Sequence, residues 1–552
     1  MSMRQKNRSV WLWITIAIFL AMCLFLFYPL IKLFISAFQE TGTGEFTFEN
    51  FLKFCSKPYY YRSLFNSIKV TVVVTLLCCI IGIPMAYIMS NYEIKGKRVI
   101  EILIIVSLLS PPFIGAYSWI VLLGRNGIIS NFLKSITGSG IEFSIYGFGG
   151  IVLVFTMKLY AYIYMYASGG LSKIDVSLTE AAENLGCHPL KKVFNMIVPL
   201  ILPSVMAGAL VVFANTFTDF GTPMMIGEGY RTMPVLVFQE FVGEVGGSAN
   251  YAAALSMIML VITIAIFLVQ RYITNKKSFE MSSLRPIVPV KPKKLSGFFM
   301  HLFIYLFVLI SLLPQITVIV SSFKNMSGPV YKEGWGFQNY IDAFETRGYT
   351  IANTYKFAIL AVLIIMILGM VIAYVSVRQR SVFSSILDVV TMFPLVISGT
   401  VLGITLLLAF NSRPLRLTGT VAILVISLVI RRLPYTIRSS SAVLKQLSPS
   451  VEEASISLGC SPLKTFAKIT GPLMLSGVFS GLILSWVTLI TELSSSVILY
   501  TAKTQTMSVA IYLQVTRNEF GMAAALATLL TVTIILSLVI FFKATGKKSI
   551  SL

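Results

Sequence analysis

The chain is poor in charge and in the residue types that build soluble active sites. Charged residues make up 12% of its 552 residues, roughly half the share typical of soluble proteins. Its two histidines and six cysteines show no metal-ligand spacing. Cys187 and Cys460 fall where cytosolic loops are expected, so disulfides are not expected there. The chain has no Gly-x-x-x-x-Gly-Lys-Ser/Thr phosphate-binding loop.

Apolar residues, in contrast, are abundant and come in long runs. Hydrophobic residues make up 56% of the chain, and stretches of about 20 residues with few charges have the length a helix needs to cross a bilayer. The first stretch is too long for a signal peptide and lacks a small-residue cleavage site. The sequence therefore predicts an all-α polytopic protein of the lipid bilayer with about 12 transmembrane helices, near 11–38, 64–90, 99–123, 148–171, 199–220, 249–271, 298–322, 354–377, 384–409, 418–440, 472–500 and 523–543.

The formal net charge of +22 is unevenly distributed between the loops. Basic residues gather before the first stretch, after the second, in the central linker and at the end of the chain, whereas the intervening loops mix acids with fewer bases. This is the positive-inside pattern, and it predicts that both termini and the linker are cytoplasmic. The charge is thus explained by membrane topology, and no nucleic-acid partner is expected. The clustered residues include Arg4, Lys6, Arg8, Lys95, Lys97, Arg98, Lys276, Lys277, Arg285, Lys543, Lys547 and Lys548.

Matched polar landmarks divide the chain into two halves. Asn66-Ser-Ile-Lys69 opens the second stretch and Asn353-Thr-Tyr-Lys356 opens the eighth. Gly82 and Tyr87 recur at identical spacing as Gly369 and Tyr374. Helical membrane proteins do not share ordered polar landmarks in general, so an internal duplication is indicated.

The duplication predicts three regions. Residues 1–273 form a first domain and 298–552 a second, each with about six spans, joined by a basic, proline-containing linker at 274–297. An even number of spans per half lets both halves enter the membrane in the same orientation. We therefore expect a parallel repeat whose halves are related by an axis along the membrane normal.

A polar motif recurs at 175–199 and 448–472. The first copy contains Glu180-Ala-Ala-Glu-Asn-Leu-Gly186, and the second contains Glu453-Ala-Ser-Ile-Ser-Leu-Gly459. Asp175 is a candidate N-cap, Ser448-Pro449 opens the corresponding helix, and each glycine suits the left-handed residue that ends a helix. A proline three residues later suits the start of another helix. The pattern predicts helix, bend and helix at the cytoplasmic face.

The same motif indicates a docking surface used twice. Its small residues allow another backbone to approach closely, and Glu180 and Glu453 offer a charge to a basic partner. The alternative is an ordinary capped turn between spans, although its repetition at equivalent places favours docking.

The two copies resemble the cytoplasmic signature of binding-protein-dependent ABC importer permeases: Glu-Ala-Ala, three residues, Gly, then a hydrophobic residue and Pro. The departures are Ser455 in place of the second Ala and Met196 in place of the usual Ile before Pro199. The resemblance covers nearly the whole chain as two fused permease domains of the MetI-like type I importer fold. It implies that the motifs couple to ATPase subunits through Glu180, Ala181, Ala182, Gly186, Glu453, Ala454, Ser455 and Gly459.

This resemblance also implies the rest of the assembly. Two copies of an ABC ATPase would dock on the motifs, and an extracytoplasmic substrate-binding protein would deliver the cargo. The chain itself would be no enzyme and would bind no cofactor, because ATP and Mg²⁺ would be used by the partner ATPase. Its place would be the bacterial inner membrane, as a multi-pass protein.

For the cargo, the fused form resembles the iron(III) importer subfamily, whose relatives carry thiamine, 2-aminoethylphosphonate, phosphorylated sugars and polyamines. The strings that carry this resemblance are Pro111-Pro-Phe-Ile-Gly-Ala-Tyr117, Gly124-Arg-Asn-Gly127, Thr218-Asp-Phe-Gly-Thr-Pro223 and Thr491-Glu-Leu-Ser-Ser495. Iron(III) is the expected substrate, with those relatives' cargoes as alternatives.

Charged residues inside predicted spans are costly and usually face a cavity or a partner. Asp219 and Glu492 occupy equivalent positions in the two halves, as do Lys158 and Arg431. They are candidates for the translocation path; the alternatives are structural ion pairs or bases that reach toward the headgroups.

Two other classes of protein remain as rivals. A secondary transporter with parallel repeats would need no ATPase, and a membrane scaffold or channel would need no energy source. Neither accounts for two matched Glu-Ala-Ala/Gly bends on one face.

Overall fold

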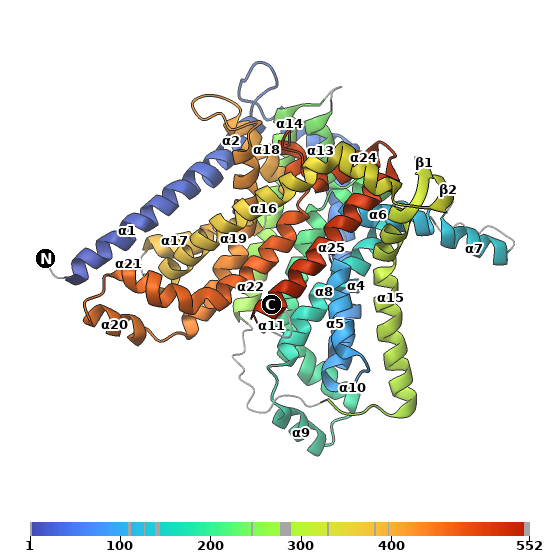
Figure 1. The fold of residues 1–552 in the computed structure, drawn as a ribbon, viewed down its shortest axis with the longest axis horizontal. Coiled ribbons are helices and arrows are strands. Elements are labelled where there is room, and N and C mark those ends of the chain that lie inside the picture. Colours follow the sequence, from blue (N-terminus) through green and yellow to red (C-terminus); the bar gives the residue numbers. More distant parts are fainter. Residues whose placement is uncertain are drawn as a thin grey trace.

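A computed structural model describes residues 3–108, 112–125, 127–137, 144–243, 247–276, 289–327, 330–379, 382–395 and 397–545. Within these ranges the chain is a bundle of helices with one antiparallel hairpin, formed by β1 (Lys324–Ser327) and β2 (Val330–Trp335) (Figure 1). The all-α polytopic architecture expected from the apolar runs is therefore confirmed. Half of the predicted linker, residues 277–288, lies outside the described residues.

The helices of the first half include two short ones at the polar motif. In chain order they are α1 (Met3–Met22), η1 (Cys23–Phe27), α2 (Tyr28–Ala37), α3 (Glu49–Ser56), α4 (Pro58–Asn91), α5 (Lys97–Leu108), α6 (Pro112–Leu123), α7 (Ile128–Thr137), α8 (Phe148–Leu171), α9 (Val176–Asn184), α10 (Pro189–Lys192), η2 (Val193–Ile197), α11 (Val198–Thr218), α12 (Gly221–Ile226), α13 (Met233–Val242) and α14 (Ala249–Lys276).

The second half repeats much of this order, with the β hairpin between its first two helices. It contains α15 (Lys294–Phe323), α16 (Gln338–Arg378), α17 (Val382–Val390), η3 (Phe393–Leu395), α18 (Gly399–Phe410), α19 (Val421–Gln446), α20 (Ser450–Ser457), α21 (Pro462–Thr465), η4 (Phe466–Thr470), α22 (Gly471–Ile490), α23 (Ser496–Leu499), α24 (Met507–Thr516) and α25 (Phe520–Thr545).

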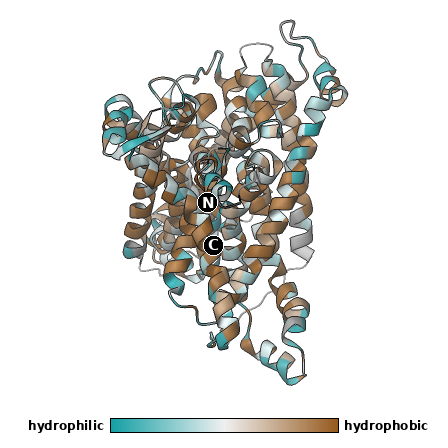
Figure 2. Ribbon diagram, turned by 90° about the vertical axis from the view of Figure 1, so that its right-hand side faces the viewer, coloured by the Kyte–Doolittle hydropathy of each residue, from teal (hydrophilic) through white to brown (hydrophobic). Residues whose placement is uncertain are grey.

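Nine helical segments of the described chain are long and apolar enough to cross a membrane, or up to 10 if one bent pair counts as a span. Apolar residues fill the middle of the bundle and polar residues gather toward its ends (Figure 2). Three of the twelve predicted stretches differ from a single apolar helix. The stretch 99–123 contains α5 and α6, 384–409 bends by 111° between Ile386–Leu395 and Gly399–Phe410, and α19 carries Arg431, Arg432, Arg438 and Lys445.

The polar landmarks at Asn66 and Asn353, which lie within α4 and α16, make the same contact in both halves. Ser67 Oγ accepts a hydrogen bond from the Met233 backbone N–H at 2.8 Å, and Thr354 Oγ1 accepts one from Met507 at 2.7 Å. Each hydroxyl thus satisfies a free N–H at the beginning of a short apolar helix, α13 or α24. The internal duplication extends to individual hydrogen bonds.

A close helix crossing built on a glycine recurs at matched positions in the two halves. A Cβ at Gly82 would lie 2.8 Å from Ile163 Cβ, and a Cβ at Gly369 would lie 2.7 Å from Thr436 Cγ2. These glycines let α4 approach α8 and α16 approach α19, which are extensively packed pairs in the bundle.

The first helix of each half crosses over to the other half. The α1–α2 segment packs against α16, α17 and α18 as well as α14, and α15 packs against α5 and α6 as well as α25 (Figure 1). Leu26 and Leu33 belong to a buried core that combines most of the second half with parts of the first, including α13 and α14, whereas Ile304 and Val308 join the other core, which is otherwise made of first-half residues. The two halves are therefore interlocked.

Candidate functional site

The first polar motif folds as the predicted helix, bend and helix. Asp175 accepts a hydrogen bond from the Ser177 N–H at 2.9 Å and caps α9. At its end, Gly186 has a φ of 72°. The Gly186 N–H bonds to the Glu183 carbonyl at 2.9 Å and the Cys187 N–H to the Ala182 carbonyl at 3.0 Å. This paired bond is a Schellman motif, which needs a left-handed residue and favours glycine.

The second motif reproduces that geometry. Gly459 has a φ of 90°. Its N–H bonds to the Ile456 carbonyl at 3.0 Å, and the Cys460 N–H bonds to the Ser455 carbonyl at 3.1 Å. The predicted bends are confirmed in both copies, while α20 begins at Ser450, one residue after the expected Ser448-Pro449 start.

After each bend a short helix leads straight into a span. α10 continues through η2 into α11, and α21 continues through η4 into α22, with the five-residue π-helical turns at matched positions. Both motifs lie at the same end of the bundle, away from α13, α24 and the β hairpin (Figure 1). Each bend is thus joined to a membrane span by one continuous helical segment.

Most of the expected docking residues are exposed. Glu180, Ala181 and Gly186 are exposed in the first copy, and their counterparts Glu453, Ala454 and Gly459 are exposed in the second. Ala182 is partly buried. Ser455 is 5% exposed and its hydroxyl bonds to that of Thr465 at 2.9 Å, so it faces the motif's interior rather than a partner.

Two further residues stand out that the sequence reasoning did not single out. Leu185 and Leu458 are each 86% exposed, the highest value among the large apolar side chains that the structure describes. They occupy equivalent positions immediately before the two glycines. The repeated Leu-Gly-Cys string was the available signal. Both copies thus present an exposed leucine and an exposed glutamate at matched positions.

A cavity of about 210 Å³ lies between the two halves. Its walls come from α5, α8 and α11 of the first half and from α19, α22 and α25 of the second. All four candidate path residues, Lys158, Asp219, Arg431 and Glu492, line this cavity. A fifth charged residue, Arg432, lines it as well.

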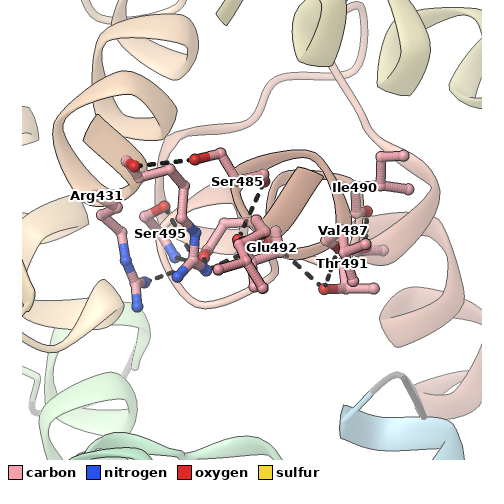
Figure 3. A network of polar contacts seen from close by, with 11 residues as sticks. Arg431, Ser485, Val487, Ile490, Thr491, Glu492 and Ser495 are labelled. Atoms are coloured by element: carbon pink, nitrogen blue, oxygen red, sulfur yellow. Dashed lines mark hydrogen bonds and ion pairs between the residues drawn. The ribbon is translucent and has the colours of Figure 1, made fainter. Parts of the chain in front are cut away.

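In the second half the charges are paired. Arg431 Nη1 lies 2.7 Å from Glu492 Oε1, and Arg432 Nη2 contacts Oε2 of the same carboxylate. The Ser495 N–H also donates to Glu492 at 3.3 Å. Figure 3 shows Arg431 and Ser495 around Glu492. The glutamate side chain is 3% exposed, so this three-charge group is a buried ion-pair network.

In the first half the equivalent charges do not touch. Lys158 and Asp219 form no ion pair within 4.0 Å, and Asp219 instead accepts a hydrogen bond from the Thr222 N–H at 3.1 Å at the start of α12. Lys158 therefore presents an ammonium group to the cavity without a direct carboxylate partner. The described residues contain no group of three or more His, Cys, Asp or Glu side chains arranged to hold a metal ion.

Comparison with known proteins places this architecture in a family. The family described as "Binding-protein-dependent transport system inner membrane component" matches residues 79–278 and again 365–548. These two segments contain both polar motifs and all five cavity charges, and together they cover more than half of the chain.

Curated relatives are similar over most of the length. The ferric transport system permease protein FbpB of Actinobacillus pleuropneumoniae is 29% identical over 537 residues, 96% of this chain and 77% of the relative. A putative ferric transport permease of Haemophilus influenzae is 28% identical over 500 residues, 89% of this chain and 78% of the relative.

A third relative is similar to about half of the chain. The putative 2-aminoethylphosphonate transport permease PhnU of Salmonella typhimurium is 24% identical over 269 residues, 48% of this chain and 92% of the relative. A relative of that length corresponds to one unit of the internal duplication. Two family segments, two matched motifs and an interlocked bundle of apolar helices have one common explanation: the chain belongs to the inner membrane component family of binding-protein-dependent transport systems, the permeases of ABC importers.

Proposed function

We propose that this chain supplies both transmembrane halves of an ABC importer and couples them to two copies of a separate ATPase subunit. The observation that carries the proposal is the duplicated helix, bend and helix with Glu180, Leu185, Glu453 and Leu458 exposed at matched positions. In the proposed cycle, ATP-driven closure of the ATPase pair displaces α9–α10 and α20–α21. The continuous helices α11 and α22 then carry that motion to the cavity.

The orientation of the chain is part of the same proposal. Both termini, the linker 274–297 and the two motifs lie in the cytoplasm, where ATP is available, in keeping with the basic clusters of the loops. ATP and Mg²⁺ belong to the ATPase partner, and the chain binds no cofactor. The opposite end, with the β hairpin, α13 and α24, receives the substrate-binding protein.

The docking surface is tested by charge reversal. We expect Glu180→Lys combined with Glu453→Lys to abolish uptake and ATPase co-purification, because a basic partner surface would then face two new cations. Co-purification in mild detergent and size-exclusion profiles are the measurements. Glu519→Lys, on an exposed residue between α24 and α25 at the opposite end of the bundle, is the control for ATPase co-purification. Normal uptake by the double variant would overturn the assignment.

The exposed leucines give an independent arm of this test. Burying a leucine side chain is worth about 1.5–3 kcal/mol, so Leu185→Ser and Leu458→Ser should each weaken ATPase binding by roughly 10- to 150-fold. Leu52→Ser, on α3, changes a leucine of 66% exposure outside the motifs and should leave binding unchanged. Equal affinities for all three variants would contradict a shared docking surface.

For the translocation path, we propose the cavity between the halves. Lys158 and Asp219 supply its unpaired charges, while Arg431 and Glu492, with Arg432, form a fixed wall. This assignment combines the two readings of the intramembrane charges: the second-half set is an ion-pair network, and it still lines the path.

The proposed cargo is iron(III), because the two relatives that cover most of the chain are named as ferric transport permeases. The measurement is ATPase stimulation of the reconstituted complex with its binding protein, compared across iron(III), 2-aminoethylphosphonate, thiamine, a sugar phosphate and spermidine. We expect iron(III) to stimulate most. Stronger stimulation by 2-aminoethylphosphonate, the cargo named for the relative similar to half of the chain, would replace iron in the assignment.

A further inference from the structure

The two motifs are attached to the bundle in different ways. Glu452, next to the docking residue Glu453, forms an ion pair with Arg378: Nε lies 2.9 Å from Oε1, and the two side chains are 13% and 12% exposed. Arg378 Nη2 also donates to the Leu447 carbonyl at 2.8 Å. The last residue of α16 thus holds both the start of α20 and the end of α19.

An aromatic group continues this brace into the bundle. The Tyr374 hydroxyl donates to Glu452 Oε2 at 3.0 Å, which satisfies the second carboxylate oxygen. The Tyr374 ring lies 4.4 Å from Trp11 and 5.0 Å from Phe466, centroid to centroid. α20 is therefore tied through one buried contact group to α1, α16 and the π-helical turn η4.

The first half lacks both charged residues of the brace and keeps the tyrosine, as Tyr87. By the spacing of the two repeats, Thr179 stands where Glu452 does and Asn91 where Arg378 does. The Asn91 amide donates to the Tyr87 carbonyl of its own helix at 2.9 Å, and the Thr179 hydroxyl donates to Val176 at 2.7 Å. Neither side chain reaches the other helix, so no ion pair at this place joins α9 to α4.

The side-chain contact between the two short helices of each motif is also more buried in the second motif than in the first. Ser455 and Thr465 join α20 to α21 by a buried hydroxyl pair, whereas their counterparts are Ala182 and Lys192. The first motif relies on an ion pair between Lys192 and Glu183, whose carboxylate side chain is 61% exposed. Solvent-exposed pairs contribute little rigidity, while a buried and fully hydrogen-bonded pair fixes one geometry.

We infer that Arg378 and Glu452 are positioning residues that hold the second motif rigidly against the bundle. The first motif, which lacks this ion pair, is attached more flexibly. The inference rests on the proposed coupling of these motifs to ATPase subunits. Movement of α20 is delivered directly to α16 and, across the Gly369 crossing, to α19, which bears Arg431 and Arg432. Movement of α9 is delivered mainly along α10 and α11, with no ion pair at the place of the brace.

Rigidity is tested without substrate or ATPase. In hydrogen–deuterium exchange of the purified full chain, peptide 450–457 should exchange more slowly than peptide 176–184. Arg378→Gln should raise exchange of 450–457 to the level of 176–184 and leave the latter unchanged. Equal exchange of the two peptides in the wild-type chain would overturn the inference.

Coupling is tested in the reconstituted complex by iron(III) uptake per ATP hydrolysed. Arg378→Gln and Glu452→Gln should lower this ratio by about tenfold while the ATPase still co-purifies, and the exchanged pair Arg378→Glu with Glu452→Arg should restore it. Asn91→Gln with Thr179→Ser is the matched first-half control and should leave the ratio unchanged. A ratio within about twofold of wild type in both brace variants would contradict the positioning role.

Failure of the proposed function and failure of the brace inference give different results. If the wild-type complex transports no iron(III), the proposed cargo is wrong, and the exchange experiment still decides the brace. If the charge-reversed docking variant keeps its ATPase, the coupling surface is wrong, even where α20 proves rigid. A brace variant that fails to fold is replaced by Tyr374→Phe, which removes only the hydrogen bond to Glu452 and should raise exchange of 450–457 by a smaller factor.

Discussion

A single glutamate holds two arginine side chains inside the second half of the bundle. Glu492 contacts Arg431 at 2.7 Å and also Arg432, with its own side chain 3% exposed. Removing one partner of a buried ionic group leaves uncompensated charge and is strongly destabilising. The stability of this wall of the cavity therefore depends on one carboxylate.

Glu492→Gln should lower the free energy of unfolding by about 3–5 kcal/mol, because both guanidinium groups lose their counter-charge. Asp219→Asn, at the equivalent position, should cost about 1 kcal/mol or less, since an amide oxygen still accepts the Thr222 N–H. Thermal unfolding midpoints of the purified proteins measure the difference. Equal losses for the two variants would mean that the first-half charges are paired as tightly.

At this scale the sequence predicted the candidate residues of the path but not how they bond. Matched spacing made Asp219 equivalent to Glu492 and Lys158 equivalent to Arg431, and the structure brings all four to one cavity. Which pair closes depends on side-chain positions in the folded bundle, and spacing along the chain carries no such information. Arg432, adjacent to the candidate Arg431, proved to be the second ion-pair partner of the Glu492 carboxylate.

Helix crossings at glycine set the shape of each half. Gly82 and Gly369 lie where α4 meets α8 and where α16 meets α19, with no room for a Cβ. Overpacking of a tight contact typically costs about 1–3 kcal/mol. Close helix packing therefore explains why both repeats have glycine at this position. The sequence showed only that the glycine recurs.

Gly82→Ala and Gly369→Ala should each destabilise the protein by about 1–3 kcal/mol. Gly149→Ala, where nothing lies within 4 Å of the added Cβ, should instead be neutral or stabilise the α8 helix by up to about 1 kcal/mol. Thermal unfolding in detergent compares the three. A stabilised Gly82→Ala variant would show that the crossing relaxes freely.

Elements were predictable where local chemistry fixes them. A glycine followed three residues later by a proline was sufficient to predict both bends of the motifs, because the left-handed residue and the helix restart are local requirements. The capping of α13 by Ser67 was not predictable, since donor and acceptor are 166 residues apart. The 111° bend before α18 could not be predicted either, because the apolar run in the sequence continues through it.

The whole molecule is held together by exchange of first helices between the halves. Counting spans predicted two equal units but gave no information on which helices are neighbours. α1–α2 packs on the second half and α15 on the first, so each half is missing part of its core without the other.

Residues 1–273 and 298–552, co-expressed as separate chains, should co-purify, because this exchange buries apolar surface on both. Either half expressed alone should be degraded, with less than about a tenth of the full chain's level in membranes. Affinity pull-down and immunoblotting provide the measurement. Accumulation of a single half to the level of the full chain would contradict the exchange.

The exchanged helices also set an order of events during synthesis. α1 leaves the ribosome more than 300 residues before α16 begins at Gln338, a delay of roughly 15–65 s at ordinary translation rates. During that interval the apolar face of α1–α2 has only lipid, the membrane insertion machinery or α14 to contact. The final neighbours of Trp11 include Tyr374 and Phe466, so the first helix made is among the last to be seated. The packing of α1 in this permease is therefore completed only after the second half has been made.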